Sequence, residues 1–181
     1  VGAAGSAIVK MLYAAGARNI VAFDSIAALS PTRKDLHGTY KQSLLKFVRS
    51  FQGDFTEGLE NTDVFIGTSK PGLLSREMVG SMAENSVVIA LSNPNPEIMP
   101  PEAYAGGAKI VCTGRSDFPN QVNNVLAFPG IFRGALDSKA KKITAKMKLS
   151  AAYALSSLVS QKDTRNGIVI PSPFDKRVAK T

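Results

Sequence analysis

The sequence has a single cysteine and a single histidine, and it has no apolar run long enough to cross a bilayer. One cysteine excludes an internal disulfide and is typical of a reducing compartment, so we expect a cytoplasmic location. Cys112 lies in a strand-like run, where a buried and unreactive thiol is expected. His37 lies in a polar stretch typical of a solvated loop. The two residues together are too few for a zinc site.

Acidic residues are outnumbered by lysine and arginine, and the 181-residue chain has a formal net charge of +8. The basic residues are scattered, with local concentrations at 139–142 and 146–148. The second group has the spacing of a solvated helix face. No nucleic-acid-binding motif occurs, and basic residues do not alternate with aromatic ones. We therefore expect neither a nucleic-acid nor a membrane partner, and we interpret the excess charge as one side of an interface within a larger protein.

Strand and helix patterns alternate along the chain, which predicts an α/β fold. We predict buried strands at 19–23, 63–66, 87–91 and 110–113, and helices at about 40–51, 75–82 and 143–159. Such an order is typical of a doubly wound, Rossmann-type parallel sheet. We assign residues 1–160 to this domain and residues 161–181 to an irregular C-terminal tail.

The chain opens with a glycine-rich turn that leads directly into a helical pattern. Gly2 and Gly5 have the spacing of the last two glycines of the dinucleotide-binding motif G-x-G-x-x-G. The first glycine and the strand before it would precede Val1. We therefore expect the first strand of the sheet to be missing from the chain, which would leave a gap beside the strand that ends at Asp24.

Asp24 follows Gly5 by 19 positions, close to the offset expected for an acid that binds the adenosine ribose. The sequence thus nominates the Gly2, Ala3, Ala4 and Gly5 turn for a pyrophosphate and Asp24 for the ribose. The alternative is an ordinary turn before a helix and an aspartate that caps a loop. Asp24 favours NAD, whereas Arg33 and Lys34 could accept the 2′-phosphate of NADP or could be solvated loop charges.

Polar loops follow three of the predicted strands, at 67–72, 92–96 and 114–119. Because ligands of open α/β sheets bind at the carboxyl ends of the strands, we expect these loops to line one crevice. In the second loop, a proline follows each of Asn93 and Asn95 and restricts the backbone. Such a rigid turn could aim an amide at a ligand, or its asparagines could satisfy their own backbone.

Residues 92–98, 113–125 and 128–137 carry a resemblance to a known family, with weaker support from 63–67 and 71–72. They resemble the C-terminal, NAD(P)-binding domain of bacterial-type malic enzymes. That family oxidatively decarboxylates (S)-malate to pyruvate and CO2 with NAD or NADP and a divalent cation, Mg or Mn. The resemblance implies that Asn93 binds the cofactor and Asn124 the substrate, with Asn123 structural between buried valines.

The family's catalytic tyrosine and lysine and its metal ligands belong outside residues 1–181. The resemblance therefore implies no catalytic and no metal-binding residue in this chain, a separate N-terminal substrate domain as partner, and an inactive chain when alone. It also implies a homo-oligomer. Two alternatives stay open: another α/β dehydrogenase domain, such as an amino-acid dehydrogenase, and a non-catalytic nucleotide-binding module. The Asn-Pro and Gln-Val-Asn-Asn segments disfavour the first alternative.

Overall fold

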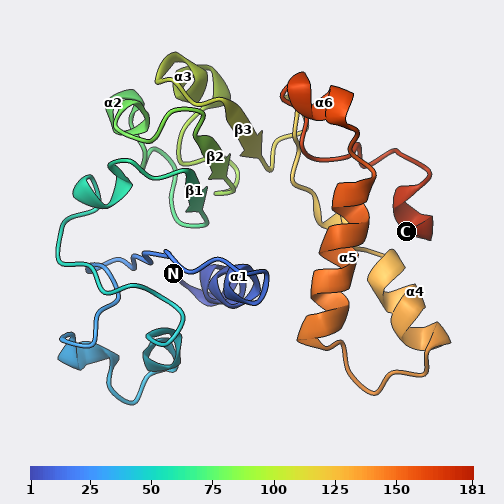
Figure 1. Ribbon diagram of the computed structural model, residues 1–181, viewed down its shortest axis with the longest axis horizontal. Coiled ribbons are helices and arrows are strands. Elements are labelled where there is room, and N and C mark those ends of the chain that lie inside the picture. The colour runs from blue at the N-terminus through green and yellow to red at the C-terminus, as the bar shows by residue number, and fades with distance from the viewer.

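The computed structural model describes residues 1–181 and is built around a sheet of three parallel strands (Figure 1). β1 (Val64–Gly67), β2 (Val87–Ala90) and β3 (Ile110–Thr113) lie side by side in that order. Val64 pairs with Val87, and Val87 pairs with Ile110. The strands coincide with three predicted apolar runs, because such runs suit parallel strands that are covered on both faces.

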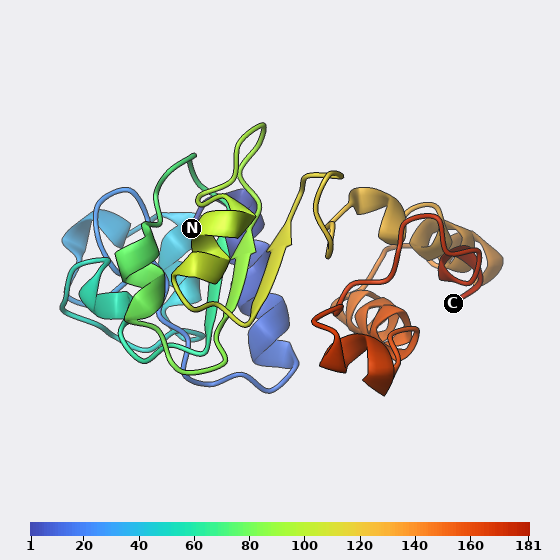
Figure 2. The ribbon, with the colours of Figure 1, turned by 90° about the horizontal axis from the view of Figure 1, so that it is seen from above.

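Helices cover both faces of this sheet. α2 (Arg76–Gly80) and α3 (Pro100–Ala105) lie on one face, and α1 (Ala3–Ala14) lies on the other (Figures 1 and 2). Ser75 caps α2 by accepting a backbone N–H of its first turn, and Pro100 begins α3, where a missing N–H costs nothing. The predicted helix at 75–82 and the doubly wound parallel arrangement are confirmed.

The sheet region, residues 57–113, begins at the short 3-10 helix η3 (Glu57–Leu59) and encloses its own core. This core is a cluster of 11 buried apolar residues drawn from the strands, α2, α3 and the loops between them: Leu59, Phe65, Leu74, Val79, Met82, Val88, Ala90, Ile98, Ala103, Ala108 and Val111. The strands and helices supply most of the apolar side chains of this cluster. The polar residues lie in the loops at the ends of the strands.

The predicted strand at 19–23 is wrong as a member of the sheet. After it the chain folds back on itself, with the Leu29 N–H donating to the Ala22 carbonyl at 2.7 Å and the Asp24 N–H to the Ala27 carbonyl at 3.1 Å. Its backbone groups are therefore bonded to this turn and, at the Ile20 carbonyl, to the Arg49 N–H, and not to a strand of the sheet. β1 is an edge strand of this sheet. The gap beside a strand that ends at Asp24 stays a prediction, because residues 19–23 do not join the sheet.

The predicted helix at 40–51 is also wrong beyond its first turn. A 3-10 helix, η2 (Tyr40–Leu44), follows the shorter η1 (Lys34–Leu36), and the backbone then turns away because the Arg49 N–H donates to the Ile20 carbonyl. Side-chain packing determines the path of the backbone here. A second cluster of five buried residues draws its members from α1, the 19–23 segment, the chain that folds back onto that segment, and both 3-10 helices: Val9, Ala22, Leu29, Leu36 and Leu44.

The helical region, residues 124–181, stands apart from the sheet (Figures 1 and 2). It contains η4 (Asn124–Leu126), α4 (Gly130–Asp137), α5 (Ala145–Ser157), α6 (Gln161–Arg165) and η5 (Val178–Lys180). α5 confirms the predicted helix at 143–159 and begins where the Thr144 hydroxyl accepts the Met147 N–H at 3.2 Å. None of α4, α5 and α6 contains a buried residue.

One buried side chain ties the two regions together. The Asn120 amide nitrogen donates to the Gly167 carbonyl at 2.8 Å, and its oxygen accepts the Val169 N–H at 2.8 Å. Asn120 also donates to the Val111 carbonyl in β3 at 3.3 Å. The end of the sheet therefore holds the segment that follows α6. The domain boundary after residue 160 stays a prediction.

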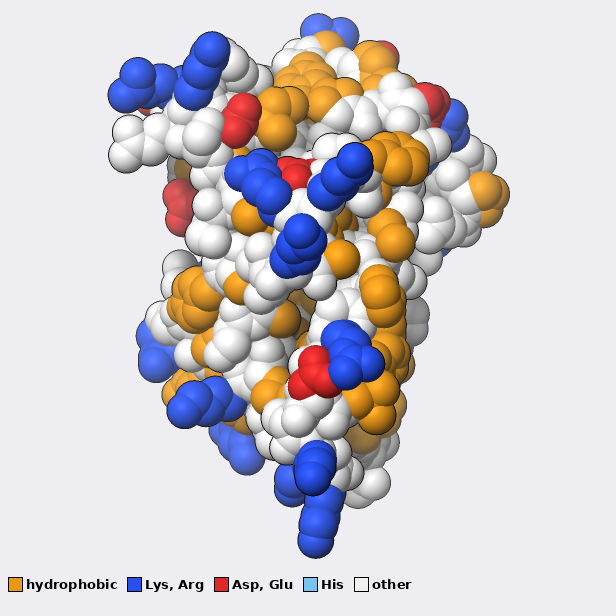
Figure 3. Space-filling model, turned by 90° about the vertical axis from the view of Figure 1, so that its right-hand side faces the viewer, with side chains coloured by type: hydrophobic (Ala, Val, Ile, Leu, Met, Phe, Trp, Pro, Cys, Tyr) orange, Lys and Arg blue, Asp and Glu red, His pale blue; other side chains and the backbone are white.

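The surface of the helical region carries both basic and apolar side chains. On the face drawn in Figure 3, Lys and Arg lie in several separate places with apolar side chains between them. The scattered arrangement predicted for the basic residues agrees with this face, while the absence of a nucleic-acid partner stays a prediction. No helix combines the length and the hydropathy needed to cross a membrane.

Candidate functional site

The glycine turn places the open end of α1 at the surface. Gly2 caps the helix with extended backbone angles, and no side chain caps it in turn. No atom lies within 4 Å of the position that a Gly2 Cβ would take, so the space beside this turn is free. The amides of the exposed Ala3 and Ala4 lie in the first turn of α1 and have no intrahelical acceptor, which is the arrangement that binds anions at helix N-termini.

Gly5 packs this helix against the sheet region. A Cβ at Gly5 would lie 3.5 Å from the Thr68 hydroxyl, in the loop after β1, and 3.1 Å from Cγ1 of Val1. The two glycines thus have the two properties that a dinucleotide turn requires, an open approach at one and close packing at the other. The role of this turn in binding a pyrophosphate stays a prediction.

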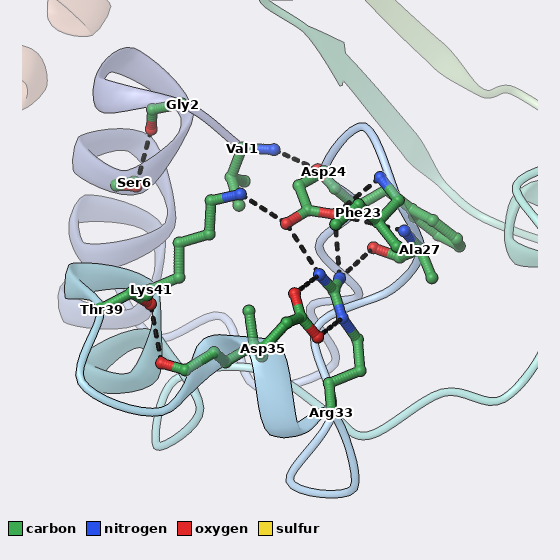
Figure 4. A network of polar contacts seen from close by, with 12 residues as sticks. Val1, Gly2, Ser6, Phe23, Asp24, Ala27, Arg33, Asp35, Thr39 and Lys41 are labelled. Atoms are coloured by element: carbon green, nitrogen blue, oxygen red, sulfur yellow. Dashed lines mark hydrogen bonds and ion pairs between the residues drawn. The ribbon is translucent and has the colours of Figure 1, made fainter.

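Asp24 lies beside this turn, because the main-chain nitrogen of Val1 contacts the carbonyl oxygen of Phe23 (Figure 4). Its side chain is only 3% exposed and is held by two cations. Arg33 donates to both carboxylate oxygens, at 2.9 and 3.2 Å, and Lys41 donates to Oδ2 at 2.5 Å. The Asp24 carboxylate is therefore one member of a charged cluster and not a lone acid.

The surroundings set the ionisation of this cluster. Burial opposes the charged form of Asp24, but the hydrogen bonds from Arg33 and Lys41 outweigh it and hold the pKa of the carboxyl well below its usual range. The carboxylate of Asp35, and then that of Asp24, raises the pKa of Arg33. Asp24, Asp35 and Arg33 are therefore charged near neutral pH. The sequence prediction had considered Arg33 and Lys34 but had missed Lys41, which follows Asp24 by 17 positions.

The loops after β2 and β3 meet at Asn93. This residue is exposed, and its side-chain oxygen lies 3.4 Å from the position that a Gly114 Cβ would take. A Cβ at this position would be in van der Waals contact with the Asn93 amide. Asn93 therefore lies where two strand ends converge, as the loop pattern predicts, although its role in binding stays a prediction.

A buried carboxylate braces these loops from behind. Glu97 is fully buried and accepts the N–H of Ser69 at 2.7 Å and the N–H of Ser92 at 3.0 Å. One side chain thus joins the loop after β1 to the loop after β2. Gly67 makes room for it, since a Cβ there would lie 2.5 Å from the Glu97 carboxyl carbon. Gly67, at the end of β1, is the sequence feature that could have indicated a buried side chain such as Glu97 at this place.

The two adjacent asparagines of the Gln-Val-Asn-Asn segment differ in their contacts. The Asn123 side chain caps η4 by accepting the Val125 N–H at 3.1 Å, as expected of a structural residue. Asn124 is exposed, and its side chain forms no hydrogen bond within the chain. The expectation of buried flanking valines is wrong, because Val125 is 46% exposed and Val122 is half-buried. The amide of Asn124 is thus available to a ligand.

The structure gathers the predicted residues into two groups and leaves one apart. Gly2 to Gly5 and Asp24 form the first group, and Asn93 with the loop at Gly114 forms the second. Asn124 lies further along, at the start of the helical region. One hollow on the surface is lined by residues from Pro71 to Arg76 and from Asn95 to Glu102, and it holds none of the predicted site residues.

The second hollow is a groove between α1 and α5. Ala3, Ser6 and Lys10 line it on one side, and Ala145 and Lys148 on the other. It begins at the first turn of α1, next to the candidate pyrophosphate position. Two lysines therefore lie along a groove that opens at the glycine turn.

The remaining candidate chemistry of the chain is sparse. Nowhere do three residues of the types His, Cys, Asp and Glu lie close enough together to hold a metal ion. Cys112 is buried in β3, as predicted, and burial raises the pKa of its thiol to about 11, which disfavours the reactive thiolate. His37 is exposed, as predicted for a loop residue.

The parallel sheet, the open glycine turn and the polar strand ends define a dinucleotide-binding domain of the Rossmann type. The sequence pattern of the family described as malic enzyme, NAD-binding domain, matches residues 14–177. The chain belongs to this family.

Individual relatives agree with this assignment. The chain is 51% identical over 180 residues to the bifunctional malic/malolactic enzyme of Bacillus subtilis, covering 98% of this chain and 44% of that protein. It is 40% identical over 194 residues to the NADP-dependent malic enzyme of Haemophilus influenzae, covering 98% and 26%. The crystal structure of the NAD-dependent malic enzyme of Thermotoga maritima superimposes with a TM-score of 0.89 at 39% identity, covering 97% and 46%. The chain spans less than half the length of these relatives.

Proposed function

We propose that this chain is the cofactor-binding part of an enzyme that oxidatively decarboxylates (S)-malate to pyruvate and CO2 with NAD or NADP. The observation that carries the proposal is the open end of α1, where the space beside Gly2 is free and the first amides lack acceptors. A pyrophosphate is the anion that such a turn binds in dinucleotide domains.

Each candidate residue then has a role. Gly2, Ala3, Ala4 and Gly5 bind the pyrophosphate, and Asp24 marks the adenosine-ribose end of the site. Asn93 binds the nicotinamide end, and Asn124 holds malate. The cofactor supplies the hydride acceptor, while these residues orient it and the substrate, since hydride transfer needs the reacting carbon atoms at near-attack distance.

Proton transfer and metal binding belong to a different part of the enzyme in this proposal. The catalytic residues and the ligands of a divalent cation, Mg or Mn, would come from an N-terminal substrate domain, and this chain alone would bind cofactor without converting malate. The enzyme would be a cytoplasmic homo-oligomer. In this proposal the cofactor-binding part contains the residues that orient the cofactor and the substrate, and the other domain contains the residues that transfer protons and bind the metal.

A first experiment tests the carrying observation. We expect Gly2→Val to weaken the binding of NADH, followed by its fluorescence, by about tenfold or more, because the added side chain fills the approach to the turn. Stability should hardly change, since a Gly2 Cβ meets no atom of the chain. Gly134→Val is the control, because its Cβ also meets nothing within 4 Å but lies in α4. Unchanged NADH binding in Gly2→Val would contradict the proposal.

A second experiment addresses the substrate end, in a protein that joins this domain to a malate-binding domain. Asn124→Ala should lower turnover by about 10- to 1000-fold, the range for loss of one preorganised donor, with cofactor affinity and stability nearly intact. Asn123→Ala should instead lower stability, because that side chain caps η4. Full activity of Asn124→Ala at saturating malate would remove Asn124 from the site. Cofactor binding without any conversion of malate would favour a non-catalytic nucleotide-binding module.

A further inference from the structure

The side chain of Glu97 connects two loops that leave the same edge of the sheet. Because β1 and β2 are parallel neighbours, the loops that follow them begin at one edge (Figure 1). Oε1 of Glu97 accepts the N–H of Ser69 at 2.7 Å, and Oε2 accepts the N–H of Ser92 at 3.0 Å. Each oxygen therefore holds a different loop, and neither contact can replace the other.

The main chain of Glu97 is anchored as well. Its carbonyl accepts the N–H of Leu74 at 3.1 Å, and both Leu74 and the next residue, Ile98, belong to the core of the sheet region. On the other side, a Cβ at Gly67 would lie 2.7 Å from Oε1, so the carboxyl group packs directly against the end of β1. The carboxyl group is thus fixed in place and holds the two loops at one separation.

The two N–H groups that Glu97 holds lie next to residues of both candidate subsites. The residue before the first of them is Thr68, whose hydroxyl lies 3.5 Å from the position that a Gly5 Cβ would take. The residue after the second is Asn93, which is proposed to bind the nicotinamide end. The Glu97 side chain therefore joins the loop that packs on the glycine turn to the loop that carries Asn93.

The separation of these two subsites matters because a dinucleotide would bind to both at once. Its pyrophosphate and its nicotinamide belong to one molecule, so the nicotinamide end binds well only where the protein places its amide at the matching distance. Glu97 is fully buried and cannot touch a ligand itself. Any effect that it has on the cofactor must therefore pass through the two loops.

We propose that Glu97 is a positioning residue that sets the distance between the glycine turn and Asn93 and thereby aligns the nicotinamide of a bound cofactor. The inference rests on the proposed function, because it assumes the pyrophosphate at the glycine turn and the nicotinamide at Asn93. Glutamine has nearly the same shape as glutamate, but its single amide oxygen accepts from one loop while its NH2 group faces the N–H of the other. Glu97→Gln therefore releases one loop and leaves the space filled.

Calorimetric titration of the full chain with NADH and with ADP-ribose, which lacks the nicotinamide, separates the two ends of the site. The unmodified protein should bind NADH more tightly than ADP-ribose. Glu97→Gln should weaken NADH binding by about tenfold, within the range for one lost buried hydrogen bond, and ADP-ribose binding by no more than about twofold. Leu59→Ala, a core substitution in η3 outside both loops, controls for lost stability and should leave the ratio of the two affinities unchanged.

Gly67→Ala tests the same contact with the carboxyl group still present. The added methyl group would lie 2.5 Å from the Glu97 carboxyl carbon and displace it, so the same fall in the affinity ratio is expected even if Glu97→Gln proves too unstable to measure. A double variant shows whether Glu97 acts through Asn93. In the Asn93→Ala background, Glu97→Gln should weaken NADH binding by less than about a further twofold.

An unchanged ratio of NADH to ADP-ribose affinity in Glu97→Gln and Gly67→Ala would overturn the proposal, because a purely structural residue would affect both ligands equally. Fully additive losses in the double variant would overturn it as well. Binding of neither ligand by the unmodified protein would instead overturn the proposed function. NADH binding that responds to Asn93→Ala but to neither Glu97→Gln nor Gly67→Ala would overturn only the positioning role.

Discussion

The sheet region and the helical region of this chain differ in how they are held together. In the sheet region, 11 buried apolar residues form one cluster. In the helical region, Val178 is the one buried residue, and Phe128, Phe132, Leu136, Tyr153 and Phe174 are exposed. Burial of apolar surface is the main favourable term in folding, so the first region has its own source of stability and the second depends on what it contacts.

The candidate site is divided between well-packed and weakly packed parts of the chain in the same way. The residues proposed for the cofactor lie next to the two buried clusters, whereas Asn124, proposed for the substrate, begins the region without a core. Rigid elements hold a bound group more accurately than weakly packed ones. The comparison therefore predicts a stable cofactor subsite and a substrate end whose geometry depends on further contacts.

The largest effect is expected when a leucine is replaced by alanine in the sheet region, and the same replacement in the helical region should have a smaller effect. Leu59→Ala opens a cavity in the core of the sheet region and should lower the free energy of unfolding by about 2–5 kcal/mol. Leu155→Ala, at a half-buried position in α5, should cost less than roughly 1.5 kcal/mol, because less surface is returned to water. Urea unfolding measures both. Equal losses would show that the helical region has a core of comparable strength.

A slightly smaller effect is expected at Glu97. Glu97→Ala leaves the N–H groups of Ser69 and Ser92 without their acceptor and should cost about 2–4 kcal/mol. NADH binding should also weaken, since both loops lose their brace. Glu102→Ala, at an exposed position in α3, is the control and should change neither quantity. An unaltered melting temperature in Glu97→Ala would exclude the bracing role.

Asn120 provides a test of how much the contact between the two regions contributes to stability. Asn120→Ala removes its hydrogen bonds to residues 167–170 and should cost about 1–3 kcal/mol, with faster amide exchange at Val169 and Ile170. Asn120 has a positive φ of 56°, so part of the loss reflects the backbone. Asn85→Ala, at an exposed residue with φ of 63°, shares that backbone cost and measures it alone. Equal losses at the two positions would mean that the tie contributes nothing.

Much of the fold follows from local sequence. The apolar runs at β1, β2 and β3 are bounded by turns and adopt the predicted strands, and the predicted helices at 75–82 and 143–159 begin at Ser75 and Thr144, which cap them. The failures at 19–23 and 40–51 share one cause. Both segments are apolar enough for a strand or a helix, but their partners are distant in sequence, with the Ile20 carbonyl bonded to the Arg49 N–H.

For the candidate site, residue type and spacing are enough to predict the glycine turn, the acid after it and the asparagines of the loops. The surroundings of each of these groups depend on tertiary contacts. Lys41 reaches Asp24 from 17 positions away, and Glu97 reaches Ser69 from 28 positions away. Hydrogen bonds and charges act through distances in space, and chain folding sets those distances after the local patterns have formed.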